Sequence, residues 1–530
     1  MNRDDMLSAL RSATKPWDFI IVGGGATGLG CAVDASSRGY RTLLLERGDF
    51  AKGTSSRSTK LVHGGVRYLR QGNISLVLEA LRERGLLIKN APHLVRNTAF
   101  VVPNYSWWEG PFYGIGLKMY DLLAGRSGFG RSKLLSRKKT LEMLPAIEPE
   151  GLDGGVIYYD GQFDDARLAV NLAQTAVERG GVMLNYVRVT GLIKKDGEVQ
   201  GAFAHDEESG EEFEIPAKVV INATGVFTDE IRRMDNADAP PMVSPSQGVH
   251  IVLDKSFLPG NVAIMVPKTD DGRVLFAIPW HGVVLVGTTD TPVKSASLEP
   301  RPLAEELAFL LDHAGRYLVK NPTADDVLST FAGLRPLVSG GNEEGSTAEL
   351  ARDHSLVISK TGLVTITGGK WTTYRKMAED TIDQAAVLAD LPERPCVTRE
   401  LPVHGLHHDA ESLGDLAYYG SDAAAIRRLI SRNPAYAERL HERFSATVAQ
   451  VVWAVRQEMA RTVEDVLSRR TRSLLLDARA SMEMAPRVAS VMAEELGRDE
   501  TWIAAQVESY TALAQGYLIP ASSDNAAGRR

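Results

Sequence analysis

Four positions in the sequence place a cation or an imidazole beside glycine or an apolar run: Arg67 in HGGVRYL, His250 in QGVHIVLD, Arg335 in AGLRPL and Lys370 in GGKWTTYR. A buried charge is costly unless an anion accompanies it. The anion is either an Asp or Glu of the chain, in an internal salt bridge, or a bound ligand. Because arginine forks match phosphate oxygens, a phosphorylated substrate is our hypothesis for the group.

His250 is the candidate general base for such a substrate, because a neutral imidazole can take a proton near neutral pH. A core histidine without a chemical role is the alternative. His63, in LVHGG, is a second candidate base, although it could instead contact a cofactor. Arg335 and Arg67 are expected to orient the substrate, and Tyr68 to help close the site.

A strand, a glycine turn and a helix near the N-terminus form the most specific local pattern. Residues 19–22 predict a buried strand, and Gly23, Gly25 and Gly28 complete a G-x-G-x-x-G fingerprint before a helix pattern that ends at Gly39. The first glycine allows a tight turn, the second lets a pyrophosphate approach, and the third lets helix and strand pack closely. Free N–H groups at the helix start favour the anion. The pattern predicts a dinucleotide site.

The segment after the fingerprint decides between nicotinamide and flavin cofactors. A second strand reaches Glu46, about 20 residues after Gly25, where a carboxylate can accept from ribose hydroxyls. A nicotinamide domain would continue with another helix and strand. Here a polar loop with glycines, many hydroxyls and Lys60 follows, and it can run along an extended cofactor such as FAD. A solvated loop is the alternative, weakened by the apolar segment LVHGG.

At this point the chain resembles the FAD-dependent glycerol-3-phosphate dehydrogenase family of D-amino-acid-oxidase-like flavoproteins. The matching stretches follow the family's order through most of residues 18–383: IVGGGATGLGCAVDASSRG, GTSSRSTKLVHGGVRYL, DDARLAVNLAQTAVERGG, VINATGVF, FAIPWHGVVLVGTTDTP, AGLRPLV and TGGKWTTYRKMAED. The first is shared by many flavoproteins, whereas HGGVRYL, GLRPL and GGKWTTYR together are much more specific. Trp371 occupies a position where we expect an aliphatic residue. This difference concerns the detailed shape of the pocket and not the class of protein.

The resemblance implies oxidation of sn-glycerol 3-phosphate to dihydroxyacetone phosphate, with hydride transfer to FAD and onward electron transfer to a membrane quinone. It places the four cationic positions at the substrate site and adds Arg352, in ELARDHSL, as a phosphate ligand. Three alternatives stay open. Oxygen could be the acceptor, the substrate could be an amino acid or sarcosine, or the fold could be a flavin-free binding protein of the Rab escort type. The sequence does not decide between a monomer and a homodimer.

The expected FAD contacts come from the fingerprint, the loop and the resemblance together. They are Gly23, Gly25, Ala26, Thr27, Gly28, Glu46, Thr54, Ser55, Lys60, Leu61, His63, Gly64, Gly65, Val189, Ala223, Gly225, Gly369, Lys370, Trp371 and Thr372. FAD is expected to bind without a covalent link, because neither cysteine has an evident flavin-attachment context.

Lys370 follows two glycines that let the backbone approach the reactive end of a flavin. A helix that starts near Thr372 would point its positive end at the ring. Two-electron reduction puts negative charge on the flavin, and the lysine and the dipole would stabilise it. Lys370 could also hold the substrate hydroxyl.

The sequence predicts an α/β fold with a FAD-binding Rossmann-like domain, an antiparallel β-sheet substrate domain and a C-terminal helical domain. Between residues 245 and 292 the apolar period changes to two, which favours antiparallel strands. The predicted segments are a leader (1–17), FAD-binding parts (18–100, 161–243 and 351–390), a substrate- and membrane-facing segment (101–160), the β domain (244–350), a linker (391–405), the helical domain (406–519) and a disordered tail (520–530).

Composition limits the compartment and the partners. A net charge of −7, from 60 basic and 67 acidic residues, argues against a general nucleic-acid binder. Cys31 and Cys396 form no disulfide framework or metal cluster, which favours a reducing compartment. The N-terminus lacks the apolar core of a secretory signal, and no stretch reaches the length of a membrane-spanning helix. The protein is therefore expected in the cytoplasm, or on the cytoplasmic side of a membrane as a peripheral protein.

A segment rich in aromatic and basic residues favours the second of these locations. Trp107, Trp108, Phe112 and Tyr113 precede a basic run that ends in Lys138 and Lys139. Aromatic residues favour the lipid headgroup region, and basic residues favour anionic lipid. A packed helix followed by a solvated basic loop is the alternative.

Overall fold

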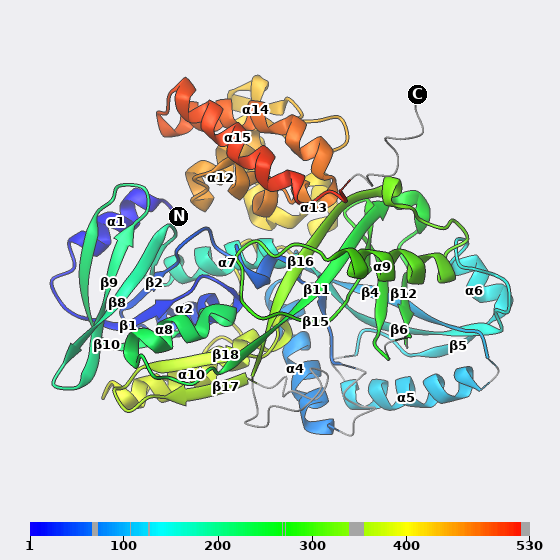
Figure 1. The fold of residues 1–530 in the computed structure, drawn as a ribbon, viewed down its shortest axis with the longest axis horizontal. Helices are drawn as coiled ribbons and strands as arrows, with labels where there is room; N and C mark the ends of the chain where they lie inside the picture. Colours follow the sequence, from blue (N-terminus) through cyan, green and yellow to red (C-terminus); the bar gives the residue numbers. More distant parts are fainter. Residues whose placement is uncertain are drawn as a thin grey trace.

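Two β-sheets and a group of C-terminal helices make up the fold (Figure 1). The computed structural model describes residues 1–65, 73–106, 108–125, 128–267, 269–270, 272–338 and 354–520. The predicted site residues Arg67, Tyr68 and Arg352, and the aromatic residue Trp107, lie outside the described residues. In the part of the chain that is described, no helix combines the length and apolar character needed to cross a bilayer.

The first sheet is the dinucleotide-binding sheet, with strand order β17-β18-β10-β1-β2-β7. Its strands are β1 (Trp17–Val22), β2 (Thr42–Leu45), β7 (Val182–Leu184), β10 (Glu212–Asn222), β17 (His354–Ile358) and β18 (Val364–Gly368). All neighbours are parallel except β17, which pairs antiparallel with β18. The hairpin β8 (Val187–Lys195) and β9 (Glu198–Asp206) extends from β10.

Both faces of this sheet are buried, as expected for parallel strands. Phe19 and Ile21 pack against helices α2 (Ala26–Ser37), α7 (Asp165–Glu178) and α10 (Tyr374–Leu388). Ile20 and Val22 face the other side, toward the β8–β9 hairpin and α1 (Arg3–Arg11). The expected leader thus contains a helix whose Leu7 and Leu10 are buried.

The second sheet is the predicted β domain, and it recruits strands from outside residues 244–350. Its strands are β3 (Leu61–Val62), β4 (Val95–Asn104), β5 (Lys133–Ser136), β6 (Gly154–Phe163), β11 (Val243–Asp254), β12 (Ala263–Val266), β13 (Leu275–Trp280), β14 (Val283–Gly287), β15 (Thr291–Pro292) and β16 (Val327–Val338). Pairing is antiparallel except between β4 and β12. The predicted boundary at residue 100 falls inside β4.

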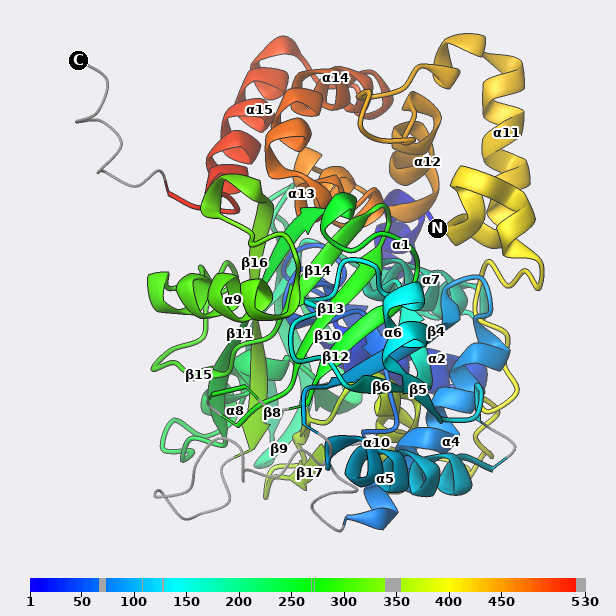
Figure 2. The same cartoon turned by 90° about the vertical axis from the view of Figure 1, so that its right-hand side faces the viewer.

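The remaining helices lie around the two sheets. Outside the C-terminal group they are α4 (Ile74–Asn90), α5 (Glu109–Ala124), α6 (Arg137–Met143), α8 (Thr228–Asp235) and α9 (Ala304–Tyr317). Figures 1 and 2 show α5 at the end of the molecule opposite the C-terminal helices.

The C-terminal helices cover one face of the second sheet. They are α11 (Ala423–Arg432), α12 (Val448–Glu458), α13 (Ser473–Leu476), α14 (Ala478–Leu496) and α15 (Glu500–Gln515). Their core includes Val252, Trp280 and Phe331 of the sheet, so helices and sheet share one apolar interior. This arrangement confirms the predicted fold class.

Candidate functional site

A cavity of 1390 Å³ lies where the two sheets meet. It exceeds the roughly 300–1,000 Å³ of ordinary small-molecule pockets, as an extended dinucleotide with a substrate requires. The β1–α2 turn and the end of β2 line one end of the cavity. Strands β11 and β16 and the segment after β18 line the other end.

The glycine fingerprint shapes the first end of the cavity as its spacing predicts. Gly23 has φ +110°, and a Cβ there would stand 2.7 Å from the Ala223 carbonyl oxygen. Gly25 is the residue before α2 and has no side chain of its own to cap the helix, and Gly25, Ala26 and Thr27 line the cavity. A Cβ at Gly28 would stand 1.9 Å from the Gly23 oxygen, so this glycine lies behind the wall and lets helix and strand pack closely.

Glu46 lies at the end of β2 on the cavity wall. Its Oε2 accepts from Gly24 N at 2.6 Å, and its Oε1 accepts from Gly48 N at 2.8 Å. Burial raises the pKa of the Glu46 carboxyl, and these two N–H donors act against that shift. The carboxylate is thereby fixed in the cavity lining, to which Val189 also belongs. This geometry fits an acceptor for the hydroxyls of a ribose.

The hydroxyl-rich loop lies along the cavity. Ser55 accepts from Ala26 N at 2.9 Å, and Thr54 donates to the Leu334 carbonyl at 2.6 Å. Both residues line the cavity, as do Thr27, Leu61, His63 and Gly65.

Lys60 and Gly64 of this loop face away from the cavity. The fully buried Lys60 ammonium donates to both oxygens of Asp165, at 2.8 and 2.7 Å. Lys60 has φ +62°, which turns its side chain off the wall formed by its neighbours. A Cβ at Gly64 would stand 2.4 Å from Leu81 and from the Tyr120 hydroxyl. Lys60 and Gly64, both expected to contact FAD, therefore do not line the cavity, and neither does Gly28.

Lys370 lies on the cavity wall after two glycines of positive φ, Gly368 at +79° and Gly369 at +71°. A 3-10 turn, Trp371–Thr373, follows, and α10 begins at Tyr374, slightly later than the sequence predicts. Trp371 donates to the Ser55 carbonyl at 2.9 Å, so the unexpected aromatic ties this turn to the hydroxyl-rich loop. Thr372, Ala223 and Gly225 also line the cavity.

Arg335 enters the cavity wall from β16. It forms an ion pair with buried Asp290 at 3.0 Å, and it donates to Thr288 Oγ1 and the Thr289 carbonyl at 3.2 and 3.0 Å. Gly248 on β11 makes room, because a Cβ there would stand 2.5 Å from the guanidinium. The internal salt bridge is thus present, and it fixes an arginine whose side chain is still 27% exposed at the cavity.

His250 lies on β11 in the same part of the cavity wall. Its ring stacks on Phe331 at 4.7 Å, and its Nε2 lies 3.0 Å from Thr59 Oγ1. Burial, and then the charges of Lys60 and Arg335, lower the pKa of His250 to about 3. The imidazole is therefore neutral at physiological pH.

Sequence reasoning missed three polar residues at this end of the cavity: Thr59, Thr288 and Asp290. All three lie within the quoted stretches GTSSRSTKLVHGGVRYL and FAIPWHGVVLVGTTDTP. Asp290, near the end of the second stretch, was the available signal. It follows an apolar strand, and a buried carboxylate needs a cationic partner.

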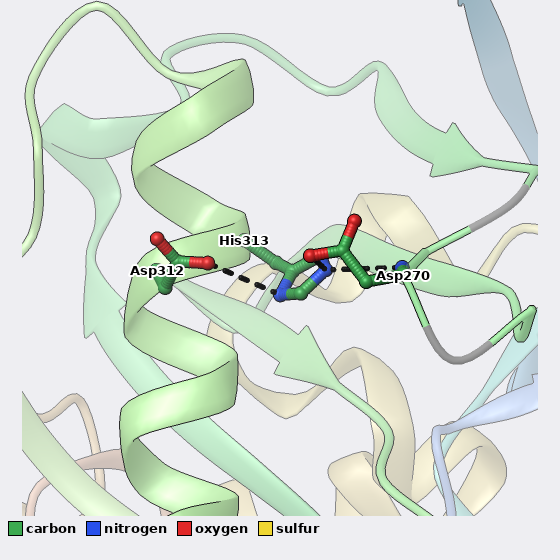
Figure 3. A group of neighbouring side chains, drawn as sticks. All are labelled: Asp270, Asp312 and His313. Carbon is green, nitrogen blue, oxygen red and sulfur yellow. Dashed lines mark hydrogen bonds and ion pairs between the residues drawn. The ribbon is translucent and has the colours of Figure 1, made fainter.

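A separate cluster outside the cavity brings together Asp270, Asp312 and His313 (Figure 3). Arg316 already supplies a cation to it, with contacts of 2.7 Å to each carboxylate. His313 Nδ1 lies 2.9 Å from the Phe309 carbonyl, and Nε2 accepts from Asp270 N at 3.4 Å. The cluster is therefore explained by ion pairs between Arg316 and the two carboxylates, with His313 hydrogen-bonded to the backbone beside them.

A Rossmann-like sheet with a glycine cradle, joined to an antiparallel sheet across one long cavity, defines the class of FAD-dependent oxidoreductases. The family model described as FAD dependent oxidoreductase matches residues 18–375, and that of the C-terminal domain of alpha-glycerophosphate oxidase matches residues 359–502. FAD is the cofactor, and the cavity fits it, because the backbone of Gly23 and Gly25 and the carboxylate of Glu46 line the same cavity.

Among these flavoproteins, the chain belongs to the family of FAD-linked glycerol-3-phosphate dehydrogenases. It is 40% identical to the mitochondrial glycerol-3-phosphate dehydrogenase of Mus musculus, over 96% of this chain and 74% of that one. The human protein is also 40% identical, over 94% and 73%. The glycerol-3-phosphate dehydrogenase of Bacillus halodurans, solved with FAD, superposes with a TM-score of 0.80 at 32% identity, covering 98% of both chains.

Proposed function

We propose that this enzyme oxidises sn-glycerol 3-phosphate to dihydroxyacetone phosphate and passes the electrons through FAD to a membrane quinone. Family membership supports the substrate, because the relatives named above are glycerol-3-phosphate dehydrogenases. The observation that carries the proposal is that Arg335, Lys370 and neutral His250 line the same cavity. An anion-binding fork, a lysine and a base are the groups that oxidation of a phosphorylated alcohol needs.

Each residue has a distinct proposed role. Arg335 holds the substrate phosphate, together with Arg67 and Arg352. Lys370 holds the reacting hydroxyl, and His250 is the final acceptor of its proton. FAD, when bound, supplies the acceptor for the hydride. The polar contacts of Arg335 with Asp290 and Thr288 hold the guanidinium plane in place, which favours bidentate phosphate binding.

Helix α5 supports the proposal of a peripheral membrane protein. Phe112, Ile115, Met119 and Leu122 recur at helical spacing and are 51, 70, 48 and 80% exposed. Single exposed apolar residues are ordinary, but a continuous stripe marks an interaction face. Basic residues on and after β5, including Lys133, Lys138 and Lys139, are exposed nearby in sequence and favour an anionic lipid surface.

The same helix supports a quinone as the electron acceptor. Phe112, Ile115 and Met119 belong both to the exposed stripe and to the cavity lining. An apolar quinone that arrives from lipid would therefore meet apolar side chains that belong both to the surface and to the cavity. Oxygen remains the second candidate acceptor, and it needs no such side chains.

Anaerobic bleaching of the flavin spectrum tests the substrate. The purified holoenzyme is mixed with glycerol 3-phosphate, glycerol and an amino acid. We expect rapid bleaching by glycerol 3-phosphate alone, and bleaching by the amino acid would instead favour an amine oxidase. Reoxidation of the bleached enzyme by a soluble quinone, compared with dissolved oxygen, then distinguishes dehydrogenase from oxidase.

A further inference from the structure

The ring nitrogens of His250 are covered, although the residue belongs to the cavity wall. The side chain is 2% exposed. Among the described residues, Nδ1 is buried without a hydrogen-bond partner, and Nε2 is 3.0 Å from Thr59 Oγ1. A base must reach the proton that it removes, directly or through one intervening group. Here the intervening group is the hydroxyl of Thr59, which is half-buried and lines the cavity.

The residues on either side of Thr59 are tied to a single buried carboxylate. Asp165 accepts from Ser58 Oγ at 2.7 Å and from Ser58 N at 3.1 Å. It also pairs with the Lys60 ammonium at 2.7 Å. The backbone is held again where Phe163 N donates to the Lys60 carbonyl at 3.0 Å. Because Ser58 and Lys60 both bind Asp165, the backbone at Thr59 has little freedom. The Thr59 hydroxyl therefore stays within hydrogen-bond distance of His250 Nε2.

One aromatic ring, that of Phe331, holds the imidazole from the other side. His250 stacks on Phe331 with an angle of 11° between the rings. The Lys60 ammonium lies 5.4 Å from the centroid of the same Phe331 ring. Gly287 opposite His250 carries no Cβ, and one there would stand 2.3 Å from the imidazole ring. Strand pairing, stacking and the Thr59 contact therefore set a single ring orientation.

We propose that Thr59 is the group through which His250 removes the proton of the substrate alcohol. The Thr59 hydroxyl donates to Nε2, so the neutral imidazole carries its proton on Nδ1. In the reaction the substrate O–H proton passes to Thr59 oxygen while the Thr59 proton passes to Nε2. Thr59 is thus unchanged, and His250 ends as the imidazolium. The hydrogen of the substrate C–H bond leaves with its electron pair to FAD, the oxidant of this enzyme class. This step rests on the proposed function.

The surrounding charges make this transfer depend on the substrate. Lys60 and Arg335 are the cations that face His250, and Asp165 and Asp290 are their partners. A phosphate bound at Arg335 adds negative charge beside one of the two cations. Opposite charge nearby favours a protonated imidazole, so the bound phosphate strengthens the base when it is needed.

Variants of Thr59 test the relay by anaerobic stopped-flow reduction of the holoenzyme with glycerol 3-phosphate. Thr59→Val keeps the shape and removes the hydroxyl, and we expect flavin reduction to slow about 100-fold, within the range of acid–base catalysis. Thr59→Ser keeps the hydroxyl and should restore most of the rate. The double variant Thr59→Val/His250→Gln should be no slower than His250→Gln, since the two groups act as a unit. A wild-type rate in Thr59→Val, or additive losses in the double variant, would overturn the relay.

Nitrogen-15 NMR of histidine-labelled protein tests the contact without any substrate. The His250 signals, assigned by their loss in His250→Gln, should show a neutral ring protonated on Nδ1 with Nε2 as acceptor. The Nε2 shift should move in Thr59→Val and not in Thr59→Ser. A ring protonated on Nε2 contradicts the relay. If wild-type protein shows the expected tautomer but is not reduced by glycerol 3-phosphate, the proposed substrate fails rather than the contact.

Discussion

Arg470 and Asp49 form a bidentate ion pair across 421 positions of the sequence, with Nη1–Oδ2 and Nη2–Oδ1 distances of 2.6 and 2.8 Å. Both side chains are fully buried, and Arg469 donates to the same carboxylate at 2.5 Å. Asp49 belongs to the loop whose next residues, Ala51 and Lys52, line the cavity. The C-terminal domain therefore holds in place a loop that contributes to the cofactor site.

Removing the carboxylate of Asp49 should destabilise the protein strongly. Burial raises the pKa of Asp49, but Arg470 and Arg469 outweigh it and lower the pKa to about 2, so the group is charged at neutral pH. Asp49→Asn leaves two buried guanidiniums without their shared anion, at a cost of about 3–5 kcal/mol. Thermal unfolding and the FAD content of the purified protein measure the effect, and both should fall.

A surface pair provides the matched control for this prediction. Arg487 and Glu438 form an ion pair at 2.6 Å, but their side chains are 40 and 53% exposed. Arg487→Ala should change stability by less than about 1 kcal/mol, as for other exposed pairs. Equal losses in the two variants would mean that the buried network does not join the domains.

Stability should also fall between about pH 6.5 and pH 9 because of His404. Its two ring nitrogens lie 2.6 Å from Glu178 and 2.8 Å from Asp422, so the ring is doubly protonated. Burial lowers the pKa of His404, but the hydrogen bonds to Asp422 and Glu178 outweigh it and raise the pKa to about 9. A raised pKa stabilises the fold fully below the unfolded value near 6.5, and this stabilisation disappears as pH rises through 9.

The His404→Gln variant isolates this contribution. The difference in unfolding free energy between wild type and variant should reach about 3 kcal/mol at pH 6, because one pKa unit represents roughly 1.4 kcal/mol. It should vanish above about pH 9.5. Thermal unfolding midpoints of both proteins across this pH range measure it, and a difference that does not depend on pH contradicts the assignment.

The features predicted well from the sequence are those that local backbone geometry determines. Gly23, Gly25 and Gly28 occupy a strand–turn–helix whose spacing specifies the role of each glycine. Residues 245–292 alternate as antiparallel strands do, and the strands appear there. In the helical domain (406–519) the sequence predicts helices but not where each one ends. The structure ends α12 at Glu458, because Met459 takes φ +57°.

The features missed from the sequence depend on contacts between distant segments. The pairing of β11 with β16 sets Ser246 opposite Arg335, and the pairing of β11 with β14 sets His250 opposite Gly287. No local pattern predicts that Thr59 lies beside His250 or that Asp290 lies beside Arg335. No local pattern predicts either that Lys60, with φ +62°, pairs with Asp165, 105 positions away.

Arg335→Lys should lower kcat/KM for glycerol 3-phosphate by about 2–3 kcal/mol, as for loss of a charge-assisted hydrogen bond. Lysine keeps the charge but not the planar fork, and it cannot reproduce the contacts to Asp290, Thr288 and Thr289. Activity on unphosphorylated glycerol should change far less, and FAD content should stay normal. If flavin is lost, or if both substrates suffer equally, Arg335 supports the cofactor site rather than the phosphate.

Charged substitutions on the exposed face of α5 should abolish binding to lipid. Ile115→Glu and Leu122→Glu each place an anion in the apolar stripe, and we expect neither variant to sediment with anionic vesicles at low salt. Val387→Glu on α10 is the control, because Val387 is 78% exposed on a different helix. Bleaching by glycerol 3-phosphate should survive in Leu122→Glu, whose side chain is outside the cavity lining. Failure of the wild-type protein to bind vesicles would refute the membrane proposal.

Lys370→Met should lower the midpoint potential of the bound flavin. Reduction by two electrons places negative charge on the flavin, and a lysine on the cavity wall stabilises that charge. Loss of about 1–3 kcal/mol corresponds to a fall on the order of 20–60 mV for a two-electron couple. Lys376→Met is the control, since Lys376 pairs with Asp380 on α10 and is not part of the cavity lining. Dye-coupled anaerobic titration measures both potentials. Because Gly368 and Gly369 set the turn, FAD should bind in both variants, and an unchanged potential in Lys370→Met would place the lysine away from the flavin.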